Sequence, residues 1–171
     1  MRETVLAFIE SLGLSPEAAV LLLATLPIFE LRGSVPVGIL LFKLPVLTTA
    51  IFSIVGNMIP IVPILFLFEP TYRWLSRYPA FEGLFEWLFR RTRRKGKVVE
   101  RLKVAGLILF VAIPLPVTGA WTGSVAAFLF RIPVWQALPA IFCGVTIACI
   151  VVTLAILGII HLPGIFGLSP P

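Results

Sequence analysis

Two ionisable side chains stand close together in an otherwise uncharged apolar stretch of this chain. Glu30 and Arg32 are the only charged residues between positions 18 and 42. A charge at membrane depth is costly, so it is normally paired or functional. Arg32 could hold an anionic group such as a phosphate through its planar fork of N–H donors, with Glu30 as a protonatable partner. The structural alternative is an ion pair between the two, or contacts of each with nearby loose backbone.

A second polar cluster lies between Pro114 and Ser124 and carries no charge. Hydroxyls and free backbone amides at the start of a helix can bind an anion. The substrate-binding candidates in this cluster are Thr118, Trp121, Thr122 and Ser124. Asn57 is a further candidate, because a polar group in the middle of the uncharged run 44–68 needs a partner. The alternative is that the hydroxyls cap their own helix.

No residue set in the sequence suits catalysis or a metal ion. There is no Ser/His/Asp set and no phosphate-binding loop. His161 is the only histidine, and Cys143 and Cys149 are not part of a C-x-x-C motif. We therefore expect no enzymatic activity, no metal and no cofactor, apart from coupling to protons.

The composition identifies the class of protein that must position these residues. Of the 171 residues, 59% are hydrophobic and 13% are charged, whereas soluble domains have about 45–50% and about 25%. This excludes an ordinary soluble enzyme and a disordered chain, and it predicts a small integral membrane protein. The net charge of +6 could suggest nucleic acid. However, ten of the fourteen basic residues fall in the segment 69–103, which predicts a cytoplasmic membrane loop and no nucleic-acid partner.

The chain contains an internal repeat. The hexapeptide Leu41–Val46 matches Leu129–Val134 at an offset of 88 residues, and at the same offset Gly56 falls on Gly144. Each half has a broken apolar segment, then Phe-basic-aliphatic-Pro-Val, then a long uncharged run. The order predicts a duplication, a plan that recurs in transporters.

Two topologies fit this repeat. Each broken segment could span the membrane once, or it could form a re-entrant hairpin. Hairpin arms of about ten residues reach about 15 Å, the middle of the bilayer. We favour the hairpins, because clustered Pro and Gly are poorly explained by a simple span. The residues expected to form the two tips are Pro27, Gly33, Pro36, Pro114, Pro116, Gly119 and Gly123.

The predicted fold is an all-α integral membrane protein with two inverted repeats, each a re-entrant helical hairpin plus a transmembrane helix. A single membrane domain, 1–171, comprises repeat 1 (about 16–68), a basic interfacial linker (69–103) and repeat 2 (about 104–160). We expect the inner (plasma) membrane as its location, with the linker cytoplasmic. Apolar residues at helical spacing predict that part of the linker lies on the membrane surface as an amphipathic helix: Phe81, Leu84, Phe85 and Leu88.

The stretches 27–38 and 113–124 resemble the two signature stretches of the small multi-drug export protein family, and the likeness extends over about residues 16–160. A more distant likeness is to the DedA family of membrane transporters. That likeness implies two facing re-entrant hairpins, proton-dependent transport and the recycling of undecaprenyl phosphate. Phe29-Glu30 followed by Pro36 fits the first DedA hairpin. The second DedA hairpin has arginines, which this chain lacks near Pro114, so Arg32 would have to supply the charge.

These observations predict a small membrane transporter of an amphiphilic substrate. We favour a phosphorylated lipid carrier, similar to undecaprenyl phosphate, bound between the two tips. The alternatives are a proton-coupled exporter of lipophilic cations and a non-transporting membrane scaffold. The expected partners are membrane lipids and a second copy of the chain in a homodimer, because so short a chain makes a thin wall around a pathway.

Overall fold

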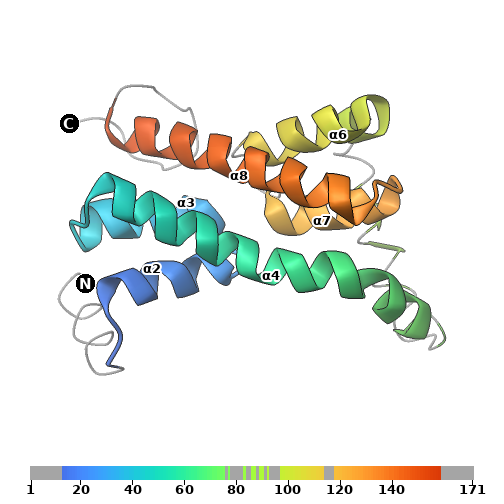
Figure 1. Ribbon diagram of the computed structural model, residues 1–171, viewed down its shortest axis with the longest axis horizontal. Helices are drawn as coiled ribbons and strands as arrows, with labels where there is room; N and C mark the ends of the chain where they lie inside the picture. The colour runs from blue at the N-terminus through green and yellow to red at the C-terminus, as the bar shows by residue number, and fades with distance from the viewer. Residues whose placement is uncertain are drawn as a thin grey trace.

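The computed structural model (Figure 1) describes residues 13–75, 77, 83, 86–87, 89–90, 92, 97–113 and 118–158. Within these ranges every regular element is helical and no strand occurs. The elements, in chain order, are α2 (Pro16–Thr25), α3 (Glu30–Pro36), the π-helix η1 (Val37–Leu41), α4 (Val46–Leu75), α6 (Lys97–Ala112), α7 (Ala120–Leu129) and α8 (Val134–Ile156).

Two of these helices are long and apolar enough to cross a membrane, α4 over Val46–Tyr72 and α8 over Val134–Ile156. They contain most of the two long uncharged runs of the sequence, 44–68 and 132–160. Each is preceded by a pair of shorter helices, α2 and α3 in the first half and α6 and α7 in the second. The prediction of an all-helical chain with two long apolar helices is confirmed.

The repeat is present in the backbone as well as in the sequence. Lys43 has φ 53° and Arg131 has φ 55°, and the two are 88 residues apart. Positive φ is uncommon for residues other than glycine. In both halves this residue is followed by an aliphatic residue, a proline and the first residue of a long helix. The same unusual turn therefore leads into α4 and α8.

The two glycines matched by the repeat have the same packing role. Gly56 lies where α2 packs on α4, and Gly144 lies where α6 packs on α8. A side chain at either position would collide with the neighbouring short helix, so glycine lets the helices approach closely. The residues met are Leu21 and Ala24 at Gly56, and Ile108 and Val111 at Gly144. These two pairs are themselves 87 residues apart.

The two halves lie in opposite directions. In Figure 1, α4 runs from left to right (teal to green) and α8 runs from right to left (orange to red). The pair α2 and α3 lies along the left part of the molecule, and the pair α6 and α7 along the right part. Between the halves, α3 packs on α8 and α7 packs on α4. The starts of the two long helices are therefore at opposite ends of the molecule.

Three of the residues predicted to form hairpin turns lie inside helices instead, so that prediction is wrong for them. Gly33 and Pro36 are in α3, and Gly123 is in α7. Pro27 does lie in the break between α2 and α3, and Gly119 directly precedes α7. Pro114 and Pro116 fall outside the described residues.

Packing and backbone geometry explain these helical positions. A Cβ at Gly33 would lie 2.7 Å from Phe29 Cδ1, and one at Gly123 would lie 2.6 Å from Val111 Cγ2. Both glycines therefore provide room for a neighbouring side chain. Pro36 has φ −58°, which suits a helix. Its missing N–H removes one helical hydrogen bond, and the wider π-helix η1 follows directly.

The boundaries of the linker differ from the predicted 69–103. Helix α4 continues to Leu75, and α6 begins at Lys97. Lys103 interrupts α6 with φ 51° and ψ −117°, and the apolar part of α6 is Leu102–Ala112. The amphipathic segment predicted from Phe81 to Leu88 rests on residues outside the described part of the chain.

We predict that Gly56→Ala and Gly144→Ala each destabilise the protein. The added Cβ meets a backbone oxygen in both cases, Leu21 O and Ile108 O, and overpacking of this kind costs about 1–3 kcal/mol. The measurement is the melting temperature in detergent. Gly83→Ala is the matched control, because nothing lies within 4 Å of a Cβ there. If both variants melted at the temperature of the wild-type protein, the close helix contacts would not be required for stability.

Candidate functional site

The first residue of α3, Glu30, reaches across to the other half of the chain. Its side chain is 8% exposed, and its Oε1 accepts a hydrogen bond from the Trp121 backbone N–H at 3.4 Å. The backbone of Glu30 has φ 44°, a conformation that costs a non-glycine residue of the order of 1–3 kcal/mol. The strained backbone directs this carboxylate to the start of α7.

The start of α7 is suited to a negative group. The first turn of a helix has free N–H groups and the positive end of the helix dipole. The N-cap residue, Gly119, provides no side chain to satisfy them. Glu30 supplies the missing cap from a position 91 residues away. The anion-binding site predicted for the second tip is thus in contact with a carboxylate of the protein itself.

Gly119 makes this contact possible. It has φ 158° and ψ −169°, a combination that is accessible to glycine and unfavourable for other residues. A Cβ built at Gly119 would overlap the Glu30 carboxylate. Any larger residue at this position would therefore displace Glu30 from α7.

Arg32 lies beside Glu30 and is half-buried. The two side chains interact electrostatically. Among the described residues, however, the Arg32 guanidinium forms no ion pair within 4.0 Å. The structural alternative of a direct Glu30–Arg32 ion pair is therefore not observed. The planar donors of Arg32 border the cavity described next.

A small cavity joins three of the predicted site residues. Glu30, Arg32 and Asn57 line it, with Gly119 and a set of apolar residues: Leu31, Val111, Ala120, Val145, Ala148 and Val152. Its volume is about 10 Å³, roughly room for one water molecule. Asn57 is 1% exposed, and its Oδ1 has no hydrogen-bond partner among the described residues. Polar groups from both halves thus converge on one water-sized space.

The hydroxyls of the second tip have other contacts. Thr118 Oγ1 donates to Ile113 O at 2.8 Å, Thr122 Oγ1 to Gly119 O at 3.3 Å, and Ser124 Oγ to Ala120 O at 2.9 Å. These bonds run to backbone carbonyls and do not cap the free N–H groups of α7, which has no side-chain cap. None of the three residues lines the Glu30 cavity. Trp121 contributes its backbone N–H to Glu30. Its indole Nε1 is buried without a partner in the described part of the chain.

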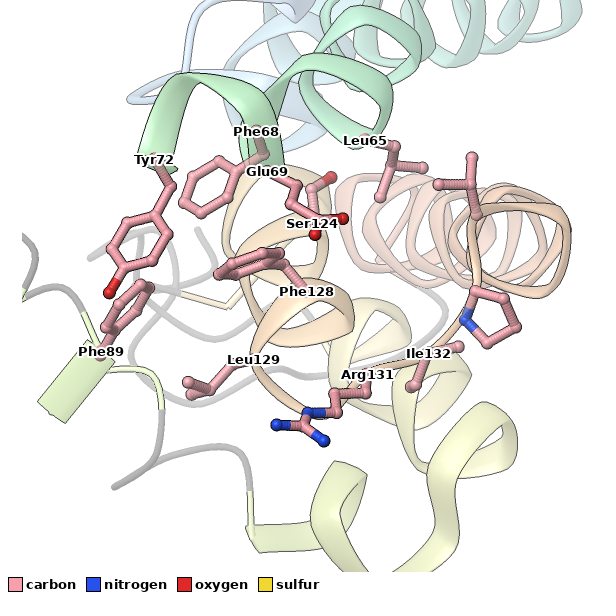
Figure 2. A pocket seen from close by; sticks show the side chains of 12 residues that line it. Leu65, Phe68, Glu69, Tyr72, Phe89, Ser124, Phe128, Leu129, Arg131 and Ile132 are labelled. Atoms are coloured by element: carbon pink, nitrogen blue, oxygen red, sulfur yellow. The ribbon is translucent and has the colours of Figure 1, made fainter. Parts of the chain in front are cut away.

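A larger cavity was not anticipated from the sequence (Figure 2). It has a volume of about 720 Å³ and lies between the later part of α4, the end of α7 and the start of α8. Ser124, Glu69 and Arg131 supply polar atoms to its wall. Four aromatic rings lie along one side, with centroids 4.9–6.1 Å apart: Phe68, Tyr72, Phe89 and Phe128. Only the i, i+4 spacing of Phe68 and Tyr72 hinted at it.

The comparisons with known proteins agree with the resemblance noted in the sequence. The model of the family described as "Putative small multi-drug export protein" matches residues 30–151. No curated protein and no solved structure matches the chain. The matched region begins at Glu30 and extends from α3 into α8, so it includes the lining of the Glu30 cavity apart from Val152. Because the match covers well over half of its length, the chain belongs to the small multi-drug export protein family.

Proposed function

We propose that this protein is a proton-coupled membrane transporter of an amphiphilic substrate, in which Arg32 holds an anionic head group and Glu30 controls the contact between the two halves. The observation that carries the proposal is the Glu30 carboxylate on the start of α7. It is a contact between halves, it depends on charge, and it adjoins a half-buried guanidinium without an ion-pair partner among the described residues. Transport by such a site also fits the family description.

The chemistry of the contact explains how a proton could be coupled to the substrate. An ionised carboxylate at a helix N-terminus contributes about 0.3–1 kcal/mol, and up to about 2 kcal/mol when partly buried. A protonated Glu30 no longer gains from the helix dipole, so its hold on α7 weakens. An anionic head group attracted by Arg32 would compete with Glu30 for the same N–H groups. Protonation of Glu30 and binding of the head group therefore favour each other.

The arrangement of the helices supports a specific membrane topology for this transporter. In our proposal α4 and α8 cross the bilayer in opposite directions, and the two pairs of short helices enter from opposite sides as re-entrant hairpins. Helix α2 has 10 residues, a length of about 15 Å that reaches the middle of a bilayer core of about 30 Å. The basic linker is then cytoplasmic, and Glu30 meets α7 at mid-depth.

One alternative substrate class has support of its own. The family description refers to the export of drugs, which favours a lipophilic cation with Glu30 as the shared site for cation and proton. In that case Arg32 is not needed for transport. The two classes can therefore be separated by the requirement for Arg32.

We predict that cysteines replacing Lys43 and Arg131 are labelled from opposite sides of the membrane, Lys43→Cys from outside. Both positions are exposed and lie at opposite ends of the molecule. The measurement uses a membrane-impermeant maleimide on cells, in a chain whose Cys143 and Cys149 have been replaced. Labelling of both cysteines from the same side would rule out the inverted arrangement and leave the four-span parallel arrangement.

We predict that Arg32→Lys slows the transport of a fluorescent prenyl phosphate in proteoliposomes by roughly tenfold, because a charge-assisted hydrogen bond contributes about 1.5–3 kcal/mol. An ammonium lacks the bidentate fork of arginine.

Glu30→Gln should remove the pH dependence of transport and have a smaller effect on substrate binding, since Gln has the same size as Glu but cannot release a proton. Lys43→Gln, which removes an exposed charge, is the control and should leave transport unchanged.

The same assay includes ethidium as a lipophilic cation. Loss of ethidium export in Glu30→Gln, with full export in Arg32→Ala, would establish the cation alternative. A stable Glu30→Ala/Arg32→Ala protein that exports both compounds normally would exclude the site. Melting curves in detergent show whether each variant is folded.

A further inference from the structure

A row of buried polar side chains lies on one face of α4. Thr49, Ser53 and Asn57 are four residues apart, and this spacing places them above one another on a helix. They are 0%, 0% and 1% exposed. The rest of this helix face is part of an apolar span, so three uncharged polar groups are buried in surroundings that do not favour them.

The row is incompletely satisfied by hydrogen bonds. Ser34 Oγ donates a hydrogen bond to Ser53 Oγ at 2.9 Å, and this bond joins α3 to α4. Thr49 Oγ1 and Asn57 Oδ1 have no partner among the described residues. By contrast, the hydroxyls of Ser124 and Thr146 bond to the carbonyl four residues earlier in their own helices. Buried polar groups without a protein partner are rare, and ordered water is the usual partner.

The second half of the chain shows that the fold does not require this row. At an offset of 88 residues the matching positions are Ala137, Ile141 and Val145. These residues are also buried, at 0%, 0% and 1% exposed, and they belong to the apolar core. The same helix position in the same duplicated unit is thus apolar in α8 and polar in α4. Packing alone therefore does not account for the polar residues.

The row leads from the Glu30 cavity to one end of the molecule. Asn57 lines that cavity, and Thr49 is in the first turn of α4. The distance along the helix is about 12 Å at 1.5 Å per residue, close to half of a hydrocarbon core of about 30 Å. Opposite Thr49 lies Gly38 of the π-helix η1, where a Cβ would overlap the Thr49 side chain. Such π-helical turns are frequent at functional sites.

We propose that Thr49, Ser53 and Asn57, with Ser34, form the wall of a water-filled path that carries protons between Glu30 and the end of the molecule where α4 begins. The path rests on the proposed role of Glu30 as the protonatable group. Hydroxyl and amide groups both donate and accept hydrogen bonds, as a chain of water molecules requires. The proton arrives as hydronium, bonds to a Glu30 carboxylate oxygen and leaves a water molecule behind.

The surroundings of Glu30 fit a path for protons better than one for an organic molecule. Of the described residues that line its cavity, Arg32 is the only other charged one, and α4, α6, α7 and α8 contribute uncharged residues. The cavity of about 10 Å³ accommodates roughly one water molecule. The substrate would therefore reach the site by another route.

The duplicated fold supplies a matched set of controls for an accessibility experiment. Single cysteines are introduced into a chain whose Cys143 and Cys149 have been replaced, and the protein is purified in detergent. Silver ion is the probe, because it is small, charged and thiol-specific. Thiols that have not reacted are counted with a maleimide after unfolding. The variants of the row are Thr49→Cys and Ser53→Cys, and the matched controls are Ala137→Cys and Ile141→Cys. Asn57 and Val145 are not used as a pair, because both line the Glu30 cavity.

The path predicts that each cysteine of the row reacts at least about tenfold faster than its control, because a dry buried thiol reacts only when the structure opens locally. Burial is nearly the same in the two sets, so burial alone predicts equal rates. Equal slow rates at all four positions would overturn the proposal. Equal fast rates would also overturn it, since they would indicate general opening. Melting curves identify any variant that is not folded.

A second measurement tests proton movement itself. Thr49→Val and Ser53→Ala should slow the uptake of protons into proteoliposomes after an acid jump, while Thr146→Val, which removes a hydroxyl bonded to its own helix, should not. Unchanged uptake in both row variants would contradict the path. If the row cysteines react quickly but transport by Glu30→Gln keeps its pH dependence, the role of Glu30 fails and the proton path to it fails as well, although the row is open to water. If transport by Glu30→Gln loses its pH dependence but the row cysteines react slowly, the path is wrong and the role of Glu30 is not affected.

Discussion

The contact between the two halves depends on one constraint: the Glu30 carboxylate is buried among apolar residues and needs a hydrogen-bond donor there. Glu30 is buried, and its Oε1 accepts a hydrogen bond from the backbone N–H of Trp121 at the start of α7. Several local features follow from this contact. Glu30 begins α3 with positive φ, position 119 must be glycine so that the carboxylate can approach, and α7 has no side-chain cap of its own. The Glu30 side chain thereby adds a hydrogen bond between the two halves to the packing of α3 and α4 on α7 and α8.

The two halves share a scaffold but not a chemistry. The turn before the long helix and the glycine under the short helix recur in both. Glu30, Arg32 and the polar row of α4 have no counterparts, because the matching positions are Thr118, Ala120 and the apolar residues of α8. Burying a polar group is costly in each place where it occurs. A duplicated scaffold can therefore keep one half apolar for stability while the other half carries the functional groups.

The sequence predicts the parts of this structure that have a pattern. Long uncharged runs predicted α4 and α8, and the matched hexapeptides predicted the duplication. The left-handed conformation of Lys43 and Arg131 inside those hexapeptides was not predicted. The partner of Glu30 could not be predicted, since a backbone N–H is the same in every residue and leaves no trace in composition or spacing. Gly33 and Gly123 were placed in turns because a glycine that makes room for a neighbour looks the same as one that bends the chain. Comparing Thr49 and Ser53 with Ala137 and Ile141 would have revealed the polar row.

The opposite directions of α4 and α8 also bear on how such a protein could have arisen. A chain with only one half would leave bare the surface that α3 and α4 present to α7 and α8. Two separate copies could cover that surface only if they entered the membrane in opposite senses, which requires a sequence with no preferred orientation. In the proposed topology, joining the copies through the strongly basic linker removes this requirement, because one orientation signal would then serve both halves. After fusion, each half is free to diverge, since neither has to be its own partner.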